Sequence, residues 1–317
     1  MTSTLRVAVL RPFALRLITP LCLAIAVAWP ATTALRAQQQ PVFRSTAVGV
    51  AVDVSVKKGN TPVANLTAAD FALSDNGVPQ TVESVQIEAV PVDVTLAVDV
   101  SGSTRGLLGR YRSDVAAIAQ LLRPVDRLRL IAFGSEVDEP LRLGAIAGRA
   151  PVDRLAASSN SAVYDGIAAA LLRPAGIDRR HLIVAFTDSY DNRSVISPDL
   201  LAAAASRSES VLHIVSREPP SMGASEMLVN GLFWPPVALD SIAEATGGLR
   251  HTPAAWITEP GGSLVFDFTK IFDDFRQSYV LRFTPAGVPL QGWHELTVGL
   301  KLKGNYKIRA RRGYFGG

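Results

Sequence analysis

Cysteine and histidine are scarce in this chain of 317 residues, which contains one Cys and four His. The cysteine, Cys22, lies in an apolar N-terminal stretch that we expect to be removed. The remaining chain then uses neither disulfides nor thiolate-bound metal. The sequence also contains no Gly-x-Ser-x-Gly, no His-Glu-x-x-His and no glycine-rich phosphate loop, so it offers no sign of the enzymes that these motifs indicate.

The chain also has no excess of positive charge outside residues 1–37. The formal net charge is +4 at pH 7, with a pI of about 9.4. Four arginines in residues 1–37 account for this excess, because that segment contains no Asp or Glu. The chain from Gln38 onward is therefore formally neutral, and we expect no nucleic-acid partner.

Residues 1–37 are predicted to be a signal peptide. Arginines precede an apolar run from Leu17 to Trp29, which is too short to span a membrane, and Ala37 offers a small residue for cleavage. We therefore expect a mature chain without a transmembrane span, located outside the cytoplasm as a secreted, periplasmic or cell-surface protein. Its length is sufficient for one large or two smaller domains.

The stretch 93–104 carries the strongest functional signal. Residues 94–98 are apolar or β-branched, as in a strand buried on both faces of a parallel sheet. Asp99, Ser101 and Ser103 follow at alternate positions. Open α/β sheets bind their ligands at the carboxyl ends of strands, and oxygen-bearing side chains suit a hard cation such as Mg²⁺.

This pattern, Asp99-Val-Ser101-Gly-Ser103, resembles the Asp-x-Ser-x-Ser signature of von Willebrand factor A-type domains, the core of their metal-ion-dependent adhesion site. In that family two serines and a loop hydroxyl contact a divalent cation, the aspartates act largely through water, and a partner's carboxylate fills the open position. The resemblance implies bound Mg²⁺, or else Mn²⁺ or Ca²⁺, and a partner protein or extracellular ligand with an exposed carboxylate.

Two further segments resemble the same family in the same order. Residues 181–188 are a second apolar strand ending in Thr-Asp, where the family has its distal metal-site aspartate. Residues 161–167 resemble the family's Thr-x-Leu-Tyr-Asp-Ala segment, with serine where threonine is usual. Serine keeps the hydroxyl and loses the methyl group that restricts the rotamer. The metal ligands implied by the resemblance are Asp99, Ser101, Ser103, Ser161 and Asp188.

From residue 91 onward strands and helices alternate, which predicts an α/β fold with a doubly wound, mostly parallel sheet. The predicted strands cover 127–133, 181–188 and 211–215 in addition to the first one; helices are predicted at 108–122, 163–171, 200–206, 239–245 and 268–275, and a long loop at 216–236. We place a Rossmann-like A-type domain at 91–277.

The flanking segments, 38–90 and 278–317, are predicted to be β structure. Asp75-Asn76-Gly77 is a hairpin signal, with a returning strand from Gln80 to Ile87. Both segments resemble regions of a secreted acidobacterial family related to A-type domain proteins. Each holds few strands, so we expect them to pair into one sandwich-like domain in which the A-type domain is inserted.

Basic residues in the tail are spaced two apart on either side of Gly304-Asn305. This spacing is typical of the solvated face of a β-hairpin, and we prefer that interpretation to a binding surface for an anionic polymer.

Other polar residues near the proposed site allow simpler interpretations. Ser and Asp are favoured helix N-caps, so Ser161 in particular could cap the helix that follows it. Asp165 is interpreted as a helix residue or an outer partner of the ligands, and Asp191 as a solvated loop carboxylate. Thr187 and Thr104 could orient ligands or bind backbone groups, and the sequence does not decide between these roles.

Two alternatives to a metal-dependent adhesion module stay open. A phosphohydrolase of the haloacid-dehalogenase type also begins with a strand ending in Asp, but it needs a second Asp where this chain has Ser101. A Ser-His-Asp hydrolase would need a nearby histidine, and His181 is predicted at the opposite edge of the sheet. The remaining alternative is a metal-free structural module. We expect an exported binding protein and no enzymatic activity.

Overall fold

The computed structural model describes residues 49–87, 90–146, 152–176, 178–216, 239–252, 257–258 and 264–317. The predicted signal peptide lies outside the described residues, as does the predicted loop except for its first residue, Ser216, which ends a strand. The described helices are too short and too polar to cross a bilayer.

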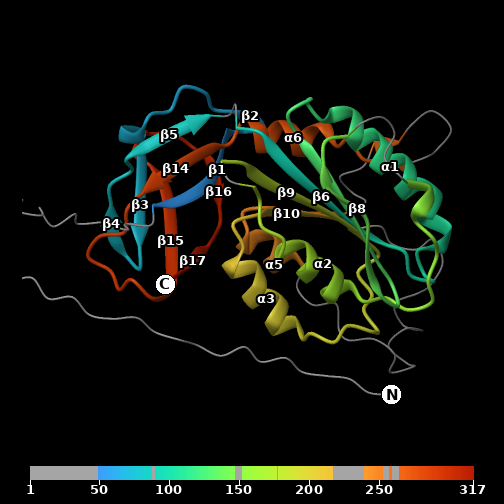
Figure 1. The fold of residues 1–317 in the computed structure, drawn as a ribbon. Helices are drawn as coiled ribbons and strands as arrows, with labels where there is room; N and C mark the ends of the chain where they lie inside the picture. Colours follow the sequence, from blue (N-terminus) through green and yellow to red (C-terminus); the bar gives the residue numbers. More distant parts are fainter. Residues whose placement is uncertain are drawn as a thin grey trace, which may run out of the picture. The chain divides into compact units, whose positions relative to one another are not determined.

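A six-stranded sheet forms the centre of the α/β module (Figure 1). Its strands are β6 (Val92–Asp99), β7 (Arg127–Phe133), β8 (Val137–Gly144), β9 (Arg180–Thr187), β10 (Val211–Ser216) and β11 (Arg250–His251). They lie in the order β11-β10-β9-β6-β7-β8, and all neighbours are parallel except β7 and β8. The predicted fold class, a doubly wound and mostly parallel sheet, is confirmed.

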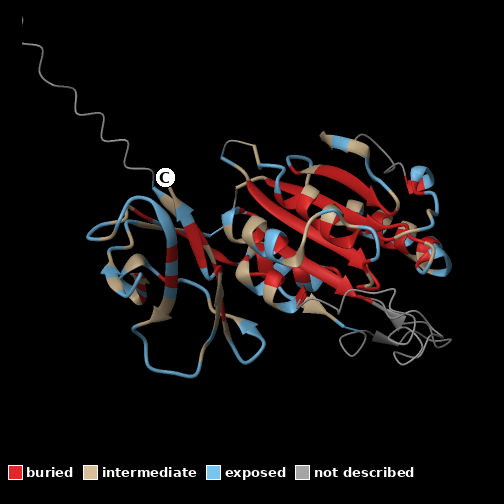
Figure 2. Cartoon of the chain, turned by 90° about the horizontal axis from the view of Figure 1, so that it is seen from below, coloured by how far each residue is buried: buried red, intermediate tan, exposed pale blue. Residues whose placement is uncertain are grey.

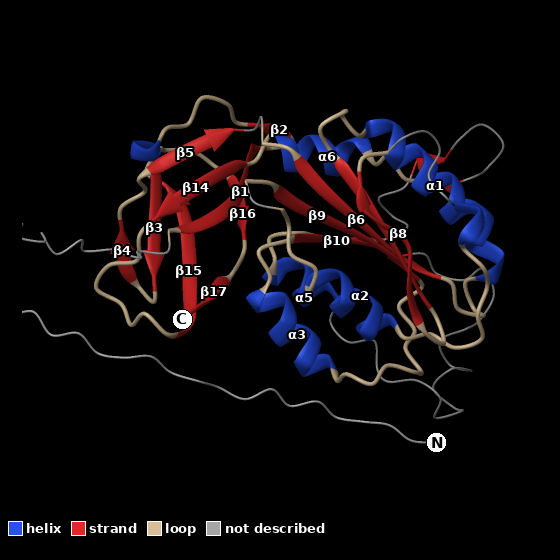
Figure 3. Cartoon of the chain, in the orientation of Figure 1, coloured by secondary structure: helices blue, strands red, loops and turns tan. Residues whose placement is uncertain are grey.

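Helices cover both faces of this sheet (Figure 3). They are α1 (Leu108–Leu121), α2 (Val163–Leu171), α3 (Pro198–Arg207), α5 (Leu239–Ala245) and α6 (Thr269–Arg276), with 3-10 turns η2 (Arg105–Leu107) and η3 (Val152–Arg154). Apolar residues of α1 and α6 pack with one face, and those of α2, α3 and α5 with the other. Every residue of β6 and β9 is therefore buried. Figure 2 shows buried strands, coloured red, at the centre of the sheet.

The strand order places a topological switch point between β6 and β9. The first strand of this sheet in the chain, β6, is followed outward by β7 and β8, whereas the chain then returns to β9 on the other side of β6. Ligands of doubly wound sheets bind where the strand order reverses, beyond the carboxyl ends of the strands. Asp99 ends β6 and Asp188 directly follows β9, so both aspartates lie at this position.

Two strands of the sheet escaped prediction. β8 contains Pro140, which cannot donate to a ladder, and it is an irregular antiparallel strand at the sheet edge. β11 is only two residues long, and β10 is its one partner among the described strands. Both lack the buried apolar run that marks β6 and β9, because an edge strand has a neighbouring strand on one side only and is more exposed to solvent.

The β module consists of two antiparallel sheets. One contains β1 (Val50–Lys58), β2 (Thr61–Pro62), β5 (Ser84–Ile87), β14 (Tyr279–Phe283) and β16 (Lys307–Ala310); the other contains β3 (Phe71–Asp75), β4 (Val78–Gln80), β15 (Gly292–Leu300) and β17 (Gly313–Gly316), and η1 (Ala68–Asp70) precedes β3. A separate pair is formed by β12 (Ile257–Thr258) and β13 (Leu264–Val265). Side chains of both larger sheets share one apolar core.

Segments from the two ends of the described chain are interleaved in this module. β14 pairs with β1 and β5, and β15 pairs with β3. The predicted pairing of the N- and C-terminal segments is thus present in the structure. The expected single strand from Gln80 to Ile87 is wrong, however, because Gln80 ends β4 in one sheet and Ser84 begins β5 in the other.

The interpretation of the basic tail residues as one solvated hairpin face is wrong in part. Lys301, Lys303 and Lys307 are exposed, but Arg309 is half-buried and Arg311 is buried. β15 and β16 belong to different sheets. Arg309 on β16 reaches the α/β module, where it pairs with Asp274 of α6 and donates to the Gly247 carbonyl. Arg311 is buried and donates to the Ser206 carbonyl of α3. These arginines therefore join the two modules, which their spacing in the sequence does not reveal.

Buried polar groups tie β17 to the rest of the β module. The carboxylate of Asp75 accepts a 2.7 Å hydrogen bond from the Tyr314 hydroxyl and lies 2.8 Å from Nδ1 of His294. All three side chains are buried. A local sequence pattern does not indicate these partners of His294, because they are 20 and 219 positions away.

Tyr314→Phe is expected to lower the free energy of unfolding by about 1–3 kcal/mol, because the buried Asp75 carboxylate would lose a donor. Urea unfolding followed by fluorescence measures this change. Tyr306→Phe is the matched control, since the Tyr306 hydroxyl makes no hydrogen bond with the described residues. An equal loss in both variants would contradict the assigned role of Tyr314.

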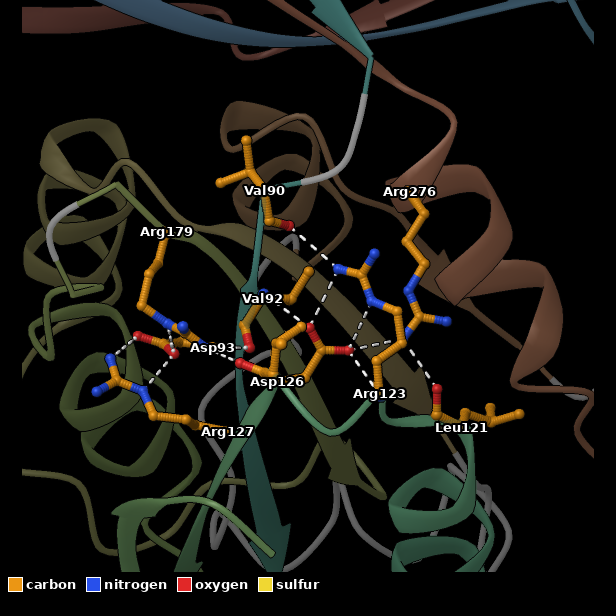
Figure 4. Close-up of polar contacts among 10 residues, drawn as sticks. Val90, Val92, Asp93, Leu121, Arg123, Asp126, Arg127, Arg179 and Arg276 are labelled. Atoms are coloured by element: carbon orange, nitrogen blue, oxygen red, sulfur yellow. Dashed lines mark hydrogen bonds and ion pairs between the residues drawn. The ribbon is translucent and has the colours of Figure 1, made fainter.

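Two buried aspartates, Asp93 and Asp126, hold together the segments at which the chain enters and leaves the α/β module (Figure 4). Asp126 accepts hydrogen bonds from the Val92 amide, Arg123 and Arg276 of α6. Arg123 also donates to the Val90 carbonyl. A single carboxylate thus connects the incoming strand β6 with the last helix, α6.

Asp93 is the second of these aspartates, and its side chain is fully buried. Its two oxygens accept hydrogen bonds from Arg127, Arg179 and the Gly176 amide, at 2.5–2.9 Å. Burial by itself raises the pKa of Asp93, but these donors outweigh it and lower the pKa to about 2.

Candidate metal centre

The loop after β6 folds around the carboxylate of Asp99. The Ser101 amide donates to Asp99 Oδ1 at 2.9 Å, and the Thr104 hydroxyl lies 3.0 Å from both the Asp99 and the Ser101 carbonyl oxygens. These bonds turn the chain so that the hydroxyls of Ser101 and Ser103 lie 3.1 Å apart. A Cβ at Gly102 would stand 2.9 Å from the Ser159 carbonyl, so glycine lets the neighbouring loop approach.

Hydroxyls from two other segments reach the second oxygen of Asp99. Thr187 at the end of β9 donates to Asp99 Oδ2 at 2.8 Å, and Ser161, just before α2, donates to it at 3.3 Å. Ser161 is itself fixed by Asn192, whose side chain accepts the Ser161 amide and whose amide donates to the Ser161 carbonyl. Thr187 thus orients a proposed ligand, a role that the sequence left undecided.

Asp188 is the fifth of the residues implied as metal ligands. Its Oδ1 accepts the Tyr190 amide at 3.2 Å, and the nearby Ser103 hydroxyl lowers the pKa of its carboxyl, against the larger effect of burial. Its Oδ2 is buried and has no hydrogen-bond partner among the described residues. The structure therefore brings together all five residues that the resemblance implies as ligands, although they come from three separate loops.

Four of the five proposed ligands are buried, and Ser103 is the exposed one. Asp99 is 0% exposed, Ser101 1%, Asp188 3% and Ser161 4%, whereas Ser103 is exposed. Although Asp99 lies at a strand end, it is fully buried, because the loops carrying Ser101 and Ser161 contact both of its oxygens. An external group can therefore approach the carboxylates beside Ser103.

The two carboxylates repel each other in this buried site. Burial and the negative charge of Asp188 raise the pKa of Asp99 to about 7, even though hydroxyl and amide donors act in the opposite direction. Burial also raises the pKa of Asp188. An uncompensated pair of buried carboxylates is costly, and a cation between them would remove this cost.

The donor set fits a hard divalent cation. It consists of carboxylate and hydroxyl oxygens, which Mg²⁺ and Mn²⁺ prefer, and the partnerless Oδ2 of Asp188 is available to a cation or to its bound water. A site built from three or more His, Cys, Asp or Glu side chains does not occur in the described part of the chain. The hydroxyls of Ser101, Ser103 and Ser161 would therefore be needed as ligands.

Asp191 and Asp165 support the loops around the site. Asp191 was interpreted as solvated, and this is wrong, because it is 1% exposed and accepts the Tyr164 amide at 3.0 Å and the Ser194 hydroxyl at 2.5 Å. It caps α2 while holding the loop after β9. Asp165, in α2, accepts the amides of residues 195 and 196, in line with its predicted place outside the ligands.

His181 lies at the opposite end of β9, as predicted. Its ring nitrogens are 2.7 Å from the Thr95 hydroxyl and 2.6 Å from the Ser210 hydroxyl. Its register partner is Asp93 at the start of β6. It is thus remote from Ser101 and Ser103, and the geometry does not assemble a Ser-His-Asp triad from them.

No protein-family model matches the sequence, and no curated protein matches it either. Solved structures do show similarity in fold. One described as von Willebrand factor type A from Catenulispora acidiphila is 14% identical, with a TM-score of 0.39, over 80% of this chain and 75% of that chain.

Two other solved structures are similar at the same level. The ArnB paralog VWA2 from Sulfolobus acidocaldarius is 10% identical, with a TM-score of 0.41, over 82% of this chain and 74% of that chain. The conserved hypothetical protein BatB from Bacteroides thetaiotaomicron is 13% identical, with a TM-score of 0.38, over 58% of this chain and 96% of that chain. Likeness of this size concerns the general fold and says nothing about function.

Proposed function

We propose that this chain is a divalent-cation-dependent binding protein whose metal centre takes up a carboxylate of a partner. The observation that carries the proposal is the pair of buried aspartates at the switch point, Asp99 and Asp188. The Ser161 hydroxyl donates to Asp99, the hydroxyls of Ser101 and Ser103 lie 3.1 Å apart beside them, and one buried oxygen of Asp188 has no partner among the described residues. This arrangement is unfavourable without a cation and favourable with one.

The five proposed ligands would have two different roles. The hydroxyls of Ser101, Ser103 and Ser161 would hold the cation, and Asp99 and Asp188 would supply the charge that attracts it. A cation held largely by neutral oxygens stays electrophilic, so it binds an external carboxylate strongly. Ser103, exposed at the rim, marks the side from which that carboxylate would enter.

Asp99 is held in place for this role by protein groups on both of its oxygens. The Ser101 amide binds Oδ1, and the Thr187 and Ser161 hydroxyls bind Oδ2. Metal ligands fixed by such outer contacts bind more tightly, because less freedom is lost on binding. We further propose that residues 1–37 direct export, so that the partner is an extracellular or periplasmic molecule.

A metal-dependent phosphohydrolase is the alternative from another class. Its second essential aspartate would stand at position 101, where the structure has the buried Ser101 hydroxyl beside that of Ser103. We therefore rank it below a binding function. Hydrolysis of a generic phosphate ester that depends on Asp99 would reverse this order.

Calorimetric titration of Mg²⁺ and Mn²⁺ into the purified protein tests the proposal. We expect one cation per chain, and saturation at about 100 times the dissociation constant should raise the free energy of unfolding by about 2.7 kcal/mol. Acetate added to the Mn²⁺-loaded protein should lower the water-proton relaxation rate, because a carboxylate would replace a bound water. Absence of cation binding would favour the metal-free structural module instead.

A further inference from the structure

Ser189, which directly follows Asp188, has a backbone conformation that serine rarely adopts. Its φ is 75°, in the left-handed region, and its side chain is buried. The other non-glycine residues with positive φ among those described are Asn65, Asn76 and Asp178, whose side chains tolerate this region. Strain of this kind persists only where surrounding contacts enforce it.

Arg250 of β11 makes those contacts from two strands away. Its Nη2 donates to the Ser189 hydroxyl at 3.2 Å, and its Nε donates to the Ser216 hydroxyl at 2.7 Å. The hydroxyls of Ser189 and Ser216 lie 3.1 Å apart. One guanidinium thus joins β11 to the end of β10 and to the loop that follows β9. Its third contact, from Nη1 to Asp240, is at the surface, where Asp240 is 59% exposed.

The conformation of Ser189 is linked directly to the two aspartates. Its amide donates to the Thr187 hydroxyl at 2.9 Å, and that hydroxyl donates to Asp99 Oδ2 at 2.8 Å. The next amide, that of Tyr190, donates to Asp188 Oδ1. If Ser189 left the left-handed region, the peptide that follows it would turn, and Asp188 Oδ1 would lose the Tyr190 amide. Asp99 would be affected indirectly, through the Thr187 hydroxyl that the Ser189 amide contacts.

We infer that Arg250 is a positioning residue of the proposed metal centre. By binding Ser189 and Ser216 it keeps Ser189 in the left-handed conformation, and this conformation orients the carboxylates of Asp99 and Asp188. Arg250 itself makes no hydrogen bond to Asp99 or Asp188; its partners among the described residues are Ser189, Ser216 and Asp240. Its effect on metal affinity rests on the proposed function, whereas its control of the Ser189 backbone does not.

Substitution of Arg250 tests its effect on the metal. Arg250→Met is expected to raise the Mg²⁺ dissociation constant about 10- to 100-fold, as loss of an outer partner of a metal ligand usually does. Adding Ser189→Gly should restore most of the affinity, because glycine adopts positive φ without support. Asp240→Asn removes only the surface contact and should change the constant less than about twofold.

Failure of Arg250→Met to fold would not prevent the test. Ser216→Ala removes the hydroxyl that contacts both Arg250 and Ser189, and it should weaken Mg²⁺ binding in the same direction. The inference is overturned if Ser216→Ala and Arg250→Met both behave like Asp240→Asn, or if Ser189→Gly restores nothing.

A measurement without metal separates this inference from the proposed function. In EDTA, Ser189→Gly should be more favourable to stability in the Arg250→Met background than in the wild type, because only there has the serine lost its support. Urea unfolding of the four proteins gives this coupling. Additive effects would overturn the inference. Wild-type protein that binds no Mg²⁺ but shows the coupling would overturn only the proposed function.

Discussion

Asp99→Asn is expected to lose more than about 100-fold in Mg²⁺ affinity, beyond the usual effect of an outer-shell change. The same substitution should stabilise the metal-free protein. Asparagine keeps the shape of the side chain but removes a buried negative charge that lies beside Asp188. Calorimetry measures the affinity, and thermal unfolding in EDTA at pH 8 measures the stability.

The control is Asp153→Asn, which removes the same charge from an exposed position. It should leave both quantities nearly unchanged. An Asp99→Asn variant that binds Mg²⁺ like the wild type would remove Asp99 from the metal centre. A variant that is less stable than the wild type in EDTA would show that the hydrogen bonds of Asp99 outweigh the cost of its charge.

The pH dependence of the metal-free protein follows from the same aspartate. Burial and Asp188 raise the folded-state pKa of Asp99 to about 7, above the ordinary value of 3.8, so the folded state takes up a proton more readily than the unfolded chain. This group therefore makes the protein more stable as the pH falls from about 7 to 4. The gain should disappear in Asp99→Asn and in the wild type saturated with Mg²⁺.

Asp93→Ala is expected to lower the free energy of unfolding by about 3–5 kcal/mol, because Arg127 and Arg179 would lose their common partner. For a chain of this size the unfolding midpoint should fall by roughly 10 °C. Differential scanning calorimetry tests this. As a control, Glu244→Gln breaks the exposed pair with Arg312 and should cost less than about 1 kcal/mol.

Acid should reproduce part of this loss in the wild-type protein. The pKa of Asp93 is lowered to about 2, so its contribution is complete above the ordinary value of 3.8 and disappears as the pH falls toward 2. Asp274, whose pKa Arg309 and Lys57 lower to about 2 against the effect of burial, acts in the same direction. Asp93→Ala should therefore show a shallower loss of stability between pH 4 and 2.

The centre of the fold could be predicted from the sequence because its signals are local. Buried runs mark β6 and β9, and Gly247 after α5 stops that helix at the predicted residue, with a φ of 82°. The ligand loops were found because a known motif fixes their order. Edge strands such as β8 and β11 give no comparable signal.

The polar networks could not be predicted, because their members are far apart in the sequence. Asp93 and Arg179 are 86 positions apart, and Ser189 and Arg250 are 61 apart. Nothing in a local pattern distinguishes a buried Asp191 from a solvated one. Which carboxylate meets which arginine depends on the order of strands in the finished sheet.

The pairing of β1 has a consequence for the order of events during synthesis. Its register partner for Val54 is Tyr279, about 225 residues further along the chain. At a typical rate of about 5–20 residues per second, β1 waits roughly 10–45 s for this partner. Meanwhile its alternating valines form a strand with two open edges, which invites pairing with other chains. Asp53, Lys57 and Lys58 place charges in this strand, and we expect them to keep the nascent chain from aggregating until β14 arrives.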